Sequence, residues 1–594
     1  MKRAIAAIGL WLTFGVAVLA VPAPAQAYGL AGPPVFDPPT PTSIGVRLPI
    51  YDSLIRSASA RMRYRVAGTT DWSYFSWLHR VRPETVRHPE HRDPEANFGG
   101  SLVGLQPGTR YEVNVYFDDG DGVLTSMTAF ESTTPMPSDP SPASVTTVSD
   151  ATTLQDALRA VQPGSVVLLQ SGTYVGDFTD YRSGTAAQPV VIRAAPGAHV
   201  TLQGLGGADQ NPVLDIAGDY THVEDLTITQ GLRGIRFGNH TTDGGATWTP
   251  NLGAVVRRVT MTDVQLGIAS GQSVGMAGAY LCDNDLTGRI GPDEYYGDGR
   301  QDWDGITVGS GSMVCHNVIR GFGDAMAVAG DGDRGIDFAD NDVQYTYDNA
   351  VEADHSYSNV RIYDNRFLNT YAPLSFQPVY GGPVYAFRNV IVRAQNEPFK
   401  FHGDFPDGAV NPPPDTLDNP NGVLIYNNTV VRAGAPLFVS TPFFIGTDFE
   451  IKNNLFMGTD GSRAVDWEAP MDNPAFDYNG YYPHDAQFLF DDKSWDSLTA
   501  LRADKTYEEH GLAISPADLP GLGNFTSFVQ PDVDVRLSPT SKARNAGQTV
   551  YGLNLDEEKP DAPTDLGAIA YGCAAPHYGP RAAGQDTTPA ALTC

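Results

Sequence analysis

The sequence predicts an all-β protein in which a right-handed parallel β-helix with three sheets follows a small β-sandwich. Three observations support this prediction. A six-residue motif with a fixed asparagine recurs at intervals close to 24 residues, as in solenoid proteins. The repeats contain short β-type runs and no helix-length segment. The region before them alternates apolar and polar residues, which is typical of half-buried strands.

Residues 1–27 have the pattern of a secretory signal peptide. Lys2 and Arg3 precede an apolar run from about residue 4 to residue 20, and small residues at 25–27 form a cleavage signal. We therefore expect a secreted protein, extracellular or periplasmic. No later apolar run has the length of a membrane span, so we expect no membrane partner.

The chain is acidic, with a formal net charge of −30 at pH 7 over 594 residues. Nucleic acid is excluded as a partner, because phosphate binding needs a basic surface. Excess carboxylates maintain solubility, and they are also the ligands that calcium prefers. We expect a monomer with no organic cofactor.

Residues 33–135 are predicted to form the β-sandwich. ARMRYRVAG and TRYEVNVYF alternate as strands, and LQPGTRY at residues 105–111 resembles the tyrosine-corner motif of fibronectin type III domains. That resemblance implies a spacer module, although some such modules bind sugar. The proline-rich residues 136–144 then form a linker.

Residues 145–470 are predicted to form the β-helix, and an amphipathic helix in TTLQDALRAV covers its first coil. The repeated motif appears as LCDNDL, VCHNVI, FADNDV, IYDNRF, AFRNVI, IYNNTV and IKNNLF. The asparagines in its fixed column are Asn284, Asn317, Asn341, Asn365, Asn389, Asn428 and Asn454. Three short strands fit into one period, so these asparagines are expected to stack about 4.8 Å apart as an amide ladder at a left-handed turn.

Four cysteines follow the predicted signal peptide, and four allow three pairings. Cys282 and Cys315 occupy the same motif column on consecutive coils, so we expect them to be neighbours, either bonded or stacked. We expect the pairs Cys282–Cys315 and Cys573–Cys594. Residues 471–594, in which the repeats fade, are predicted to pack along the β-helix or to cap its end.

Residues from about 145 to 572 resemble secreted polysaccharide lyases of the chondroitinase B and alginate lyase type, within the pectate lyase-like superfamily. The resemblance rests on SGTYVGDFTDYRSGTAAQPVVIRAAPGAHVTLQG and on the closing TDLGAIAYG. Because these are scaffold segments, the resemblance implies the fold and a polysaccharide substrate rather than particular catalytic residues.

Three strands that follow the ladder asparagines carry polar side chains on one predicted face. If Val351, Leu374 and Phe399 point inward, the alternating positions form two outward columns. The columns are Glu352–Ser375–Lys400 and Asp354–Gln377–His402. Charged ladders are common on exposed strands, but acids, an amide, a lysine and a histidine on one face favour a functional site.

A group of aspartates is the candidate metal site. Asp304, Asp324 and Asp348 are expected at equivalent positions on three successive coils, and Asp302 lies in the preceding insertion. Stacked carboxylates repel each other unless they are protonated, hydrogen-bonded or bridged by a cation. Calcium bridging and the capping of turns by backbone hydrogen bonds are both open.

The first functional hypothesis is a polysaccharide lyase that acts on an acidic glycan. β-Elimination beside a uronate needs a base, a cation that neutralises the carboxylate and a proton donor for the leaving oxygen. His402 is the better base and Lys400 the better neutralising cation, since nearby acids keep a lysine charged. Tyr380 is the candidate proton donor. Further candidates for substrate contacts are Gln377, Ser375, His355, Asp348 and Trp303.

Two alternatives remain at this stage. A glycoside hydrolase would use a pair of carboxyl groups, here Glu352 and Asp354, with Asp348, Asp324 and Asp304 as further candidates. A protein that binds carbohydrate or mediates adhesion would use the same face without catalysis.

Overall fold

The computed structural model describes most of the chain. The described residues are 29–51, 57–83, 95–122, 124–206, 211–238, 249–270, 275–292, 294, 303–403, 418–440, 444–526, 533–551, 553, 564–582 and 584–585. The predicted signal peptide, Asp302 and Cys594 lie outside them.

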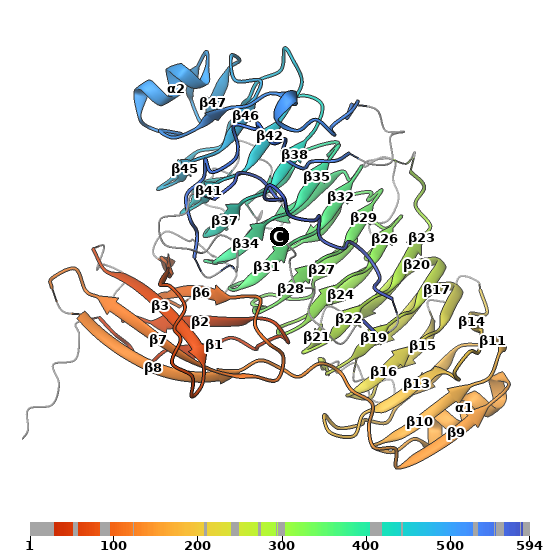
Figure 1. The fold of residues 1–594 in the computed structure, drawn as a ribbon. Coiled ribbons are helices and arrows are strands. Elements are labelled where there is room, and N and C mark those ends of the chain that lie inside the picture. Colours follow the sequence, from red (N-terminus) through yellow and green to blue (C-terminus); the bar gives the residue numbers. More distant parts are fainter. Residues whose placement is uncertain are drawn as a thin grey trace, which may run out of the picture.

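Two antiparallel four-stranded sheets form an N-terminal sandwich (Figure 1). The first has the order β1 (Val35–Phe36), β2 (Ile44–Pro49), β6 (Asn97–Leu102) and β5 (His79–Val81). The second has the order β4 (Ser76–Trp77), β3 (Ser59–Val66), β7 (Arg110–Asp118) and β8 (Leu124–Ser132). Alternating apolar residues of both sheets form one core, in which Phe98 packs edge-on against Phe117. The Tyr111 hydroxyl accepts a hydrogen bond from the Gln106 amide at 2.8 Å, as a tyrosine corner requires. Membership of the fibronectin type III family stays a prediction.

Parallel strands stacked coil upon coil form the rest of the fold, a parallel β-helix (Figure 1). Its right-handed sense stays a prediction, which rests on the general handedness of parallel crossovers. Within the described residues, sheet I has thirteen strands. These are β9 (Ser144–Val148), β10 (Ser165–Leu169), β13 (Val190–Ala194), β16 (Thr221–Glu224), β19 (Val255–Arg257), β22 (Tyr280–Cys282), β25 (Met313–Cys315), β28 (Asp337–Ala339), β31 (Val360–Tyr363), β34 (Val384–Phe387), β37 (Val423–Tyr426), β41 (Glu450–Lys452) and β45 (Ala475–Asp477).

Sheets II and III are joined because two long strands, β17 (Thr227–Phe237) and β20 (Thr260–Ser270), run through both. Sheet II contains in addition β11 (Gly172–Val175), β14 (Val200–Gln203), β23 (Asp285–Gly288), β26 (Val318–Arg320), β29 (Asp342–Gln344), β32 (Arg366–Leu368), β35 (Val390–Val392), β38 (Thr429–Val431), β42 (Leu455–Met457), β46 (Gly480–Tyr482) and β49 (Leu512–Ala513). Sheet III contains in addition β12 (Phe178–Asp180), β15 (Pro212–Ile216), β24 (Ile306–Val308), β27 (Met326–Val328), β30 (Asn349–Glu352), β33 (Ala372–Phe376) and β36 (Phe399–Phe401). The coil stacking therefore continues past residue 470, where the motif fades in the sequence.

Shorter elements complete the two ends of the β-helix. Helix α1 (Ala151–Ala160) buries Leu154 and Leu158 in the core beside the first strands. Beyond sheet III, β39 (Leu437–Val439), β43 (Val465–Trp467), β47 (Phe488–Phe490) and β48 (Lys493–Trp495) form a further small sheet. The remaining elements are the pairs β18 (Asn251–Leu252) with β21 (Met276–Ala277) and β40 (Gly446–Thr447) with β44 (Met471–Asp472), the helix α2 (Leu498–Asp504) and a 3₁₀ turn at Pro516–Asp518.

The predicted asparagine ladder is confirmed. Each ladder asparagine is fully buried, and its side-chain amide donates to the oxygen of the next, as Asn317 does to Asn341 at 2.9 Å. The ladder continues beyond Asn454 to Asn479 and ends on Glu508, whose Oε1 accepts from the Asn479 amide at 2.7 Å. The left-handed backbone conformation was expected at the ladder asparagines themselves, but it occurs one residue earlier. The residue before each ladder asparagine has the positive φ, as at Asp340 with 56°, because that bend turns the amide inward.

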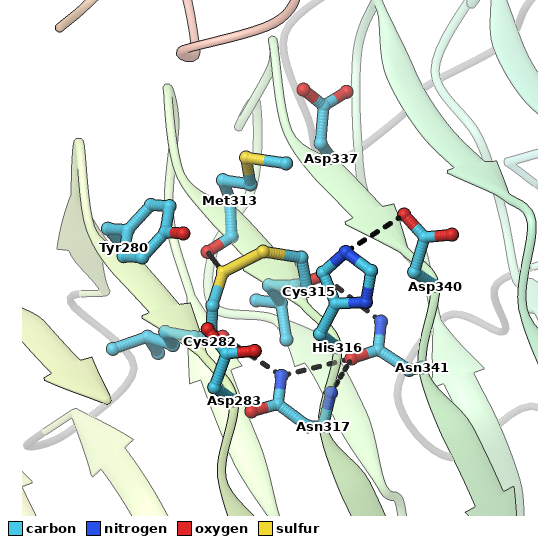
Figure 2. Close-up of a disulfide and its surroundings, with 12 residues drawn as sticks. Tyr280, Cys282, Asp283, Met313, Cys315, His316, Asn317, Asp337, Asp340 and Asn341 are labelled. Atoms are coloured by element: carbon cyan, nitrogen blue, oxygen red, sulfur yellow. Dashed lines mark hydrogen bonds and ion pairs between the residues drawn. A yellow bond between two sulfur atoms is a disulfide. The ribbon is translucent and has the colours of Figure 1, made fainter. Parts of the chain in front are cut away.

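The disulfide between Cys282 and Cys315 is confirmed. The two residues pair on neighbouring strands of sheet I, with 4.5 Å between their Cα atoms (Figure 2). Cys573 is also disulfide-bonded, and its predicted partner Cys594 lies outside the described residues.

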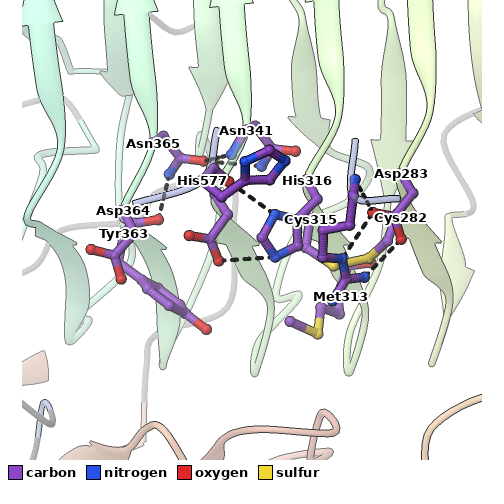
Figure 3. A network of polar contacts seen from close by, with 12 residues as sticks. Cys282, Asp283, Met313, Cys315, His316, Asn341, Tyr363, Asp364, Asn365 and His577 are labelled. Atoms are coloured by element: carbon purple, nitrogen blue, oxygen red, sulfur yellow. Dashed lines mark hydrogen bonds and ion pairs between the residues drawn. A yellow bond between two sulfur atoms is a disulfide. The ribbon is translucent and has the colours of Figure 1, made fainter. Parts of the chain in front are cut away.

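The C-terminal segment runs back along the β-helix beside the ladder (Figure 1). Gly567 donates to the Asn453 carbonyl, and Gly579 donates to the Asp340 carbonyl, which lies four ladder positions nearer the N-terminal end. Farther along, the guanidinium group of Arg581 holds both oxygens of Asp283, at 2.9 and 2.7 Å. His316 of the β-helix lies beside His577 of this segment (Figure 3), with its Nδ1 atom 3.1 Å from the His577 carbonyl oxygen. The Nε2 atom of His316 lies 3.5 Å from Asp340 (Figure 2). The segment is thus fixed by polar contacts at several coils.

The sandwich is fixed to sheet I by buried polar contacts. Asp37 accepts hydrogen bonds from Ser358 at 2.8 Å and from Asn359 at 2.7 Å. The Ser101 hydroxyl donates to Asn359 at 2.9 Å, and Arg82 forms an ion pair with Asp448. These contacts join the two parts of the fold into one unit.

Candidate active site

The first predicted polar column exists on the outward face of sheet III. Glu352 pairs with Ser375 and Ser375 pairs with Lys400 on successive strands. Toward the N-terminus the column continues through Ala327 and Thr307. Small residues therefore flank the charged part of the column on its N-terminal side.

The inward positions of the same strands are core residues, as predicted. Val351, Leu374, Phe399 and Phe401 are fully buried in the main hydrophobic core of the β-helix. Since side chains alternate along a strand, this burial fixes Lys400 on the outer face.

The second column lies just beyond the strand ends. The Asp354 carboxylate accepts hydrogen bonds from the Ser375 hydroxyl at 2.8 Å and from the backbone amide of Gln377 at 2.7 Å. On the next coil, Nε2 of His402 lies 3.7 Å from Oε2 of Glu397. The two predicted columns are therefore linked to each other through Ser375.

Lys400 is surrounded by acids. Its Nζ atom lies 3.5 Å from both carboxylate oxygens of Asp348. Burial opposes the charge of Lys400, but the carboxylates of Asp348 and Asp354 outweigh it and raise the lysine pKa above its ordinary value. Lys400 is therefore a fixed cation and not a base at neutral pH.

Glu352 has the opposite electrostatic setting. Burial, and then the negative charges of Asp354 and Asp304, raise the pKa of Glu352 to about 9. Burial also raises the pKa of Asp354, but Lys400 and the two hydrogen bonds oppose this rise and favour its ionised form. Glu352, with a pKa of about 9, therefore keeps its proton at neutral pH.

The predicted stack of three aspartates is wrong in one position. The third place after Asp304 and Asp324 is taken by Asn349, whose backbone and side-chain amides both donate to Oδ1 of Asp324 at 2.8 Å. Arg320 and Gln344 pair on neighbouring coils. The segment from Gln344 to Asn349 is one residue longer than the segment from Arg320 to Asp324. This extra residue displaces Asp348 from the stack and places its carboxylate beside Lys400.

The described residues supply only part of the set of oxygen ligands that a calcium ion would need. Asp324 caps the turn at Asn349, and Oδ2 of Asp304 accepts from the Thr307 hydroxyl at 2.9 Å. Among the described residues, no group of three or more histidine, cysteine, aspartate or glutamate side chains is placed to hold a metal ion. Turn capping accounts for Asp324 and the Thr307 hydroxyl bond for Asp304, and a bound calcium ion stays a prediction that involves the undescribed Asp302.

The remaining predicted residues differ in accessibility. Tyr380 is fully buried, stacked on His355 at 5.7 Å between ring centroids and packed against Tyr357, so it does not present a proton donor to a polymer on this face. His355 is partly exposed, and its Nδ1 lies 3.8 Å from Asp331. Trp303 lies farther toward the N-terminal coils, with the Arg233 guanidinium carbon 5.9 Å from its ring centroid.

Sequence reasoning missed Glu397. This glutamate is fully buried, accepts a hydrogen bond from the Ser440 backbone and faces His402. It occupies the register position of Asp324 and Asn349, two coils beyond Asn349. The sequence did contain a signal for Glu397: it lies two residues before its strand, as Asp304 and Asp324 lie two residues before theirs.

Comparisons with known proteins establish no family. No family model matches the chain, and no curated protein matches it. One similar solved structure is an alginate lyase from Paenibacillus sp. str. FPU-7, with 16% sequence identity, a TM-score of 0.29, and coverage of 55% of this chain and 97% of that chain. The β-helix is therefore established by its own strand pairing. None of the described helices combines the length and apolarity needed to cross a membrane.

Proposed function

We propose that the protein is an exported polysaccharide-cleaving enzyme whose reaction takes place on the outward face of sheet III. The observation that carries this proposal is the partly buried Glu352, whose raised pKa favours its protonated form, beside the hydrogen-bonded carboxyl group of Asp354 and the cation of Lys400. Carboxyl groups whose environments push their pKa values apart are suited to paired acid and base roles.

Glycoside hydrolysis fits this pair best. Glu352 would donate its proton to the leaving glycosidic oxygen, and Asp354, held by Ser375 and Gln377, would act as base or nucleophile. Lys400 would balance the negative charge of Asp348 and oppose the rise in the pKa of Asp354. The excess of acids over cations in this group disfavours a uronate carboxylate at the cleavage point and favours a neutral sugar there.

β-Elimination is the second candidate, and the adjacency of Lys400 and His402 favours it. Lys400 is a permanent cation that would neutralise a uronate carboxylate, and His402 would remove the neighbouring proton. In this mechanism Glu352 takes the role of proton donor that the buried Tyr380 does not fill.

One product assay separates the two reactions. The purified protein is incubated with neutral and uronate-containing polysaccharides, and reducing ends are measured together with absorbance near the ultraviolet edge. Hydrolysis gives reducing ends without new absorbance, whereas elimination gives an unsaturated, absorbing product. Glu352→Gln should abolish either reaction, and Glu509→Gln, an exposed glutamate on the far end of the molecule, should not. Retention of a glycan without cleavage would contradict the enzyme proposal and support a binding protein.

A further inference from the structure

We propose that the cavity between the sandwich and sheet I is a second carbohydrate-binding site, which takes a neutral oligosaccharide. The cavity has a volume of about 380 Å³. Its walls come from three parts of the chain: strands β4 and β5 of the sandwich, strands β34, β37 and β41 of the β-helix, and residues 548–551 and 553 of the C-terminal segment.

Aromatic side chains line this cavity. Trp77 and Tyr551 come from the sandwich and the C-terminal segment, and Tyr385 and Tyr426 come from sheet I. Trp77 is 69% exposed, which is unusual for so large an apolar side chain, so its ring surface is available to a ligand that enters from solvent. Tyr385 and Tyr426 are buried, so the ring face suited to stacking against the apolar face of a sugar is that of Trp77.

Polar groups converge on the same cavity. Oε2 of Glu450 accepts hydrogen bonds from the Tyr426 hydroxyl at 2.9 Å and from Nζ of Lys452 at 3.1 Å. Burial opposes the charge of Glu450, but Lys452 and His79 outweigh it and lower the glutamate pKa. Since Glu450 and Lys452 balance each other, the cavity offers donors and acceptors to hydroxyl groups without attracting a charged ligand.

The position and rigidity of the cavity also favour a ligand site. Small-molecule sites lie preferentially at domain interfaces and have volumes of about 300 to 1,000 Å³. The walls are held together by the Arg82–Asp448 ion pair and by the buried bonds of Ser101 to Asn359, so binding would require little ordering of the protein.

This site is separate from the proposed catalytic face. It lies on sheet I, whereas Glu352 and Lys400 lie on sheet III. The inference therefore does not depend on which reaction the catalytic face performs, or on whether it performs one.

The test is a titration of the full chain carrying Glu352→Gln, to prevent turnover, with cellotetraose, xylotetraose and mannotetraose, and with tetragalacturonate as the anionic comparison. Calorimetry and tryptophan fluorescence both report binding, because the exposed Trp77 lies in the site. We expect saturable binding of at least one neutral tetrasaccharide and a quenched or shifted Trp77 emission. Trp77→Ala should weaken that binding about tenfold or more.

Two further variants distinguish a specific loss of binding from misfolding of the protein. Tyr51→Ala removes an exposed aromatic of the sandwich that does not line the cavity, and it should leave binding unchanged. Tyr551→Ala removes a second wall of the cavity and should weaken binding, with unchanged thermal unfolding as evidence of an intact fold. The proposal is overturned if no neutral tetrasaccharide binds, if tetragalacturonate alone binds, or if Trp77→Ala and Tyr551→Ala both bind like the parent protein.

Discussion

Two glutamates in the β-helix, Glu508 and Glu352, have raised pKa values but different surroundings. Burial raises the pKa of Glu508 to about 8, yet its carboxyl group accepts hydrogen bonds from Asn479 and Tyr481, both at 2.7 Å, and closes the end of the asparagine ladder. Glu352 lies on the outward face of sheet III among charged groups, with Asp354, Asp348 and Lys400 around it.

The comparison shows that a raised pKa does not by itself identify a catalytic group. The hydrogen bonds of Glu508 are all used to terminate a regular structure, and the residue is sealed from solvent. Glu352 is only partly buried and lies where one coil gains an extra residue and displaces Asp348. The regular part of the repeat thus builds the scaffold, and the irregular coil builds the candidate site.

The largest expected effect is on turnover in Glu352→Gln. Removal of the proton donor should lower kcat about 10²- to 10⁴-fold, while the midpoint of thermal unfolding stays the same or rises because a buried acid is replaced by an amide. Steady-state kinetics on the polysaccharide found in the product assay measures it, with Glu509→Gln as the matched control. Turnover within threefold of the wild type would remove Glu352 from the mechanism.

Asn365→Ala in the ladder should lower the stability of the fold and leave turnover unchanged. This change removes the acceptor for the Asn341 backbone and side-chain amides, both at 3.0 Å, and leaves buried donors unsatisfied. The free energy of unfolding should fall by about 3 kcal/mol, measured with denaturant, while kcat per folded molecule stays the same. A normal stability would show that the ladder contributes little to the fold.

Glu508→Gln should change the pH dependence of stability. The folded-state pKa of about 8 lies above the ordinary glutamate value, so the folded state binds more protons than the unfolded state between those two values. Stability is therefore full at low pH and falls as the pH rises toward about 8. In Glu508→Gln the difference in unfolding free energy between pH 5 and pH 8 should shrink by on the order of a few kcal/mol. An unchanged difference would mean that Glu508 titrates normally.

The smallest expected effect belongs to His402→Ala. Under hydrolysis by Glu352 and Asp354, the histidine only packs beside Glu397, so kcat should fall less than about tenfold. Elimination would instead lose its base and fall about 10²-fold or more. Kinetics of this variant, with the product assay, decides between the two candidate reactions.

Much of the scaffold could be predicted from the sequence because repeats reveal stacking directly. The ladder asparagines and the pairing of Cys282 with Cys315 follow from positions in one motif column. The outward placement of Glu352 and Lys400 follows from strict alternation with core residues such as Phe399.

The details of the site depended on features that alternation does not reveal. The displacement of Asp348 depends on one extra residue in a loop, and the burial of Tyr380 depends on rings that pack over it from the preceding coil. The extension of the coils to residue 513 was missed, although Asn479 continues the ladder between Phe476 and Tyr481 of the core. Loop length and cross-coil packing are properties of the folded chain and leave little trace in a single sequence.

The most direct test of the account is the infrared spectrum of the wild type minus that of Glu352→Gln in the carboxylic acid region. We predict a band of a neutral carboxyl group at pH 7 that is lost as the pH rises past about 9. A difference spectrum that shows an ionised carboxylate at pH 7, titrating near the ordinary glutamate value, would contradict the role of Glu352 as proton donor.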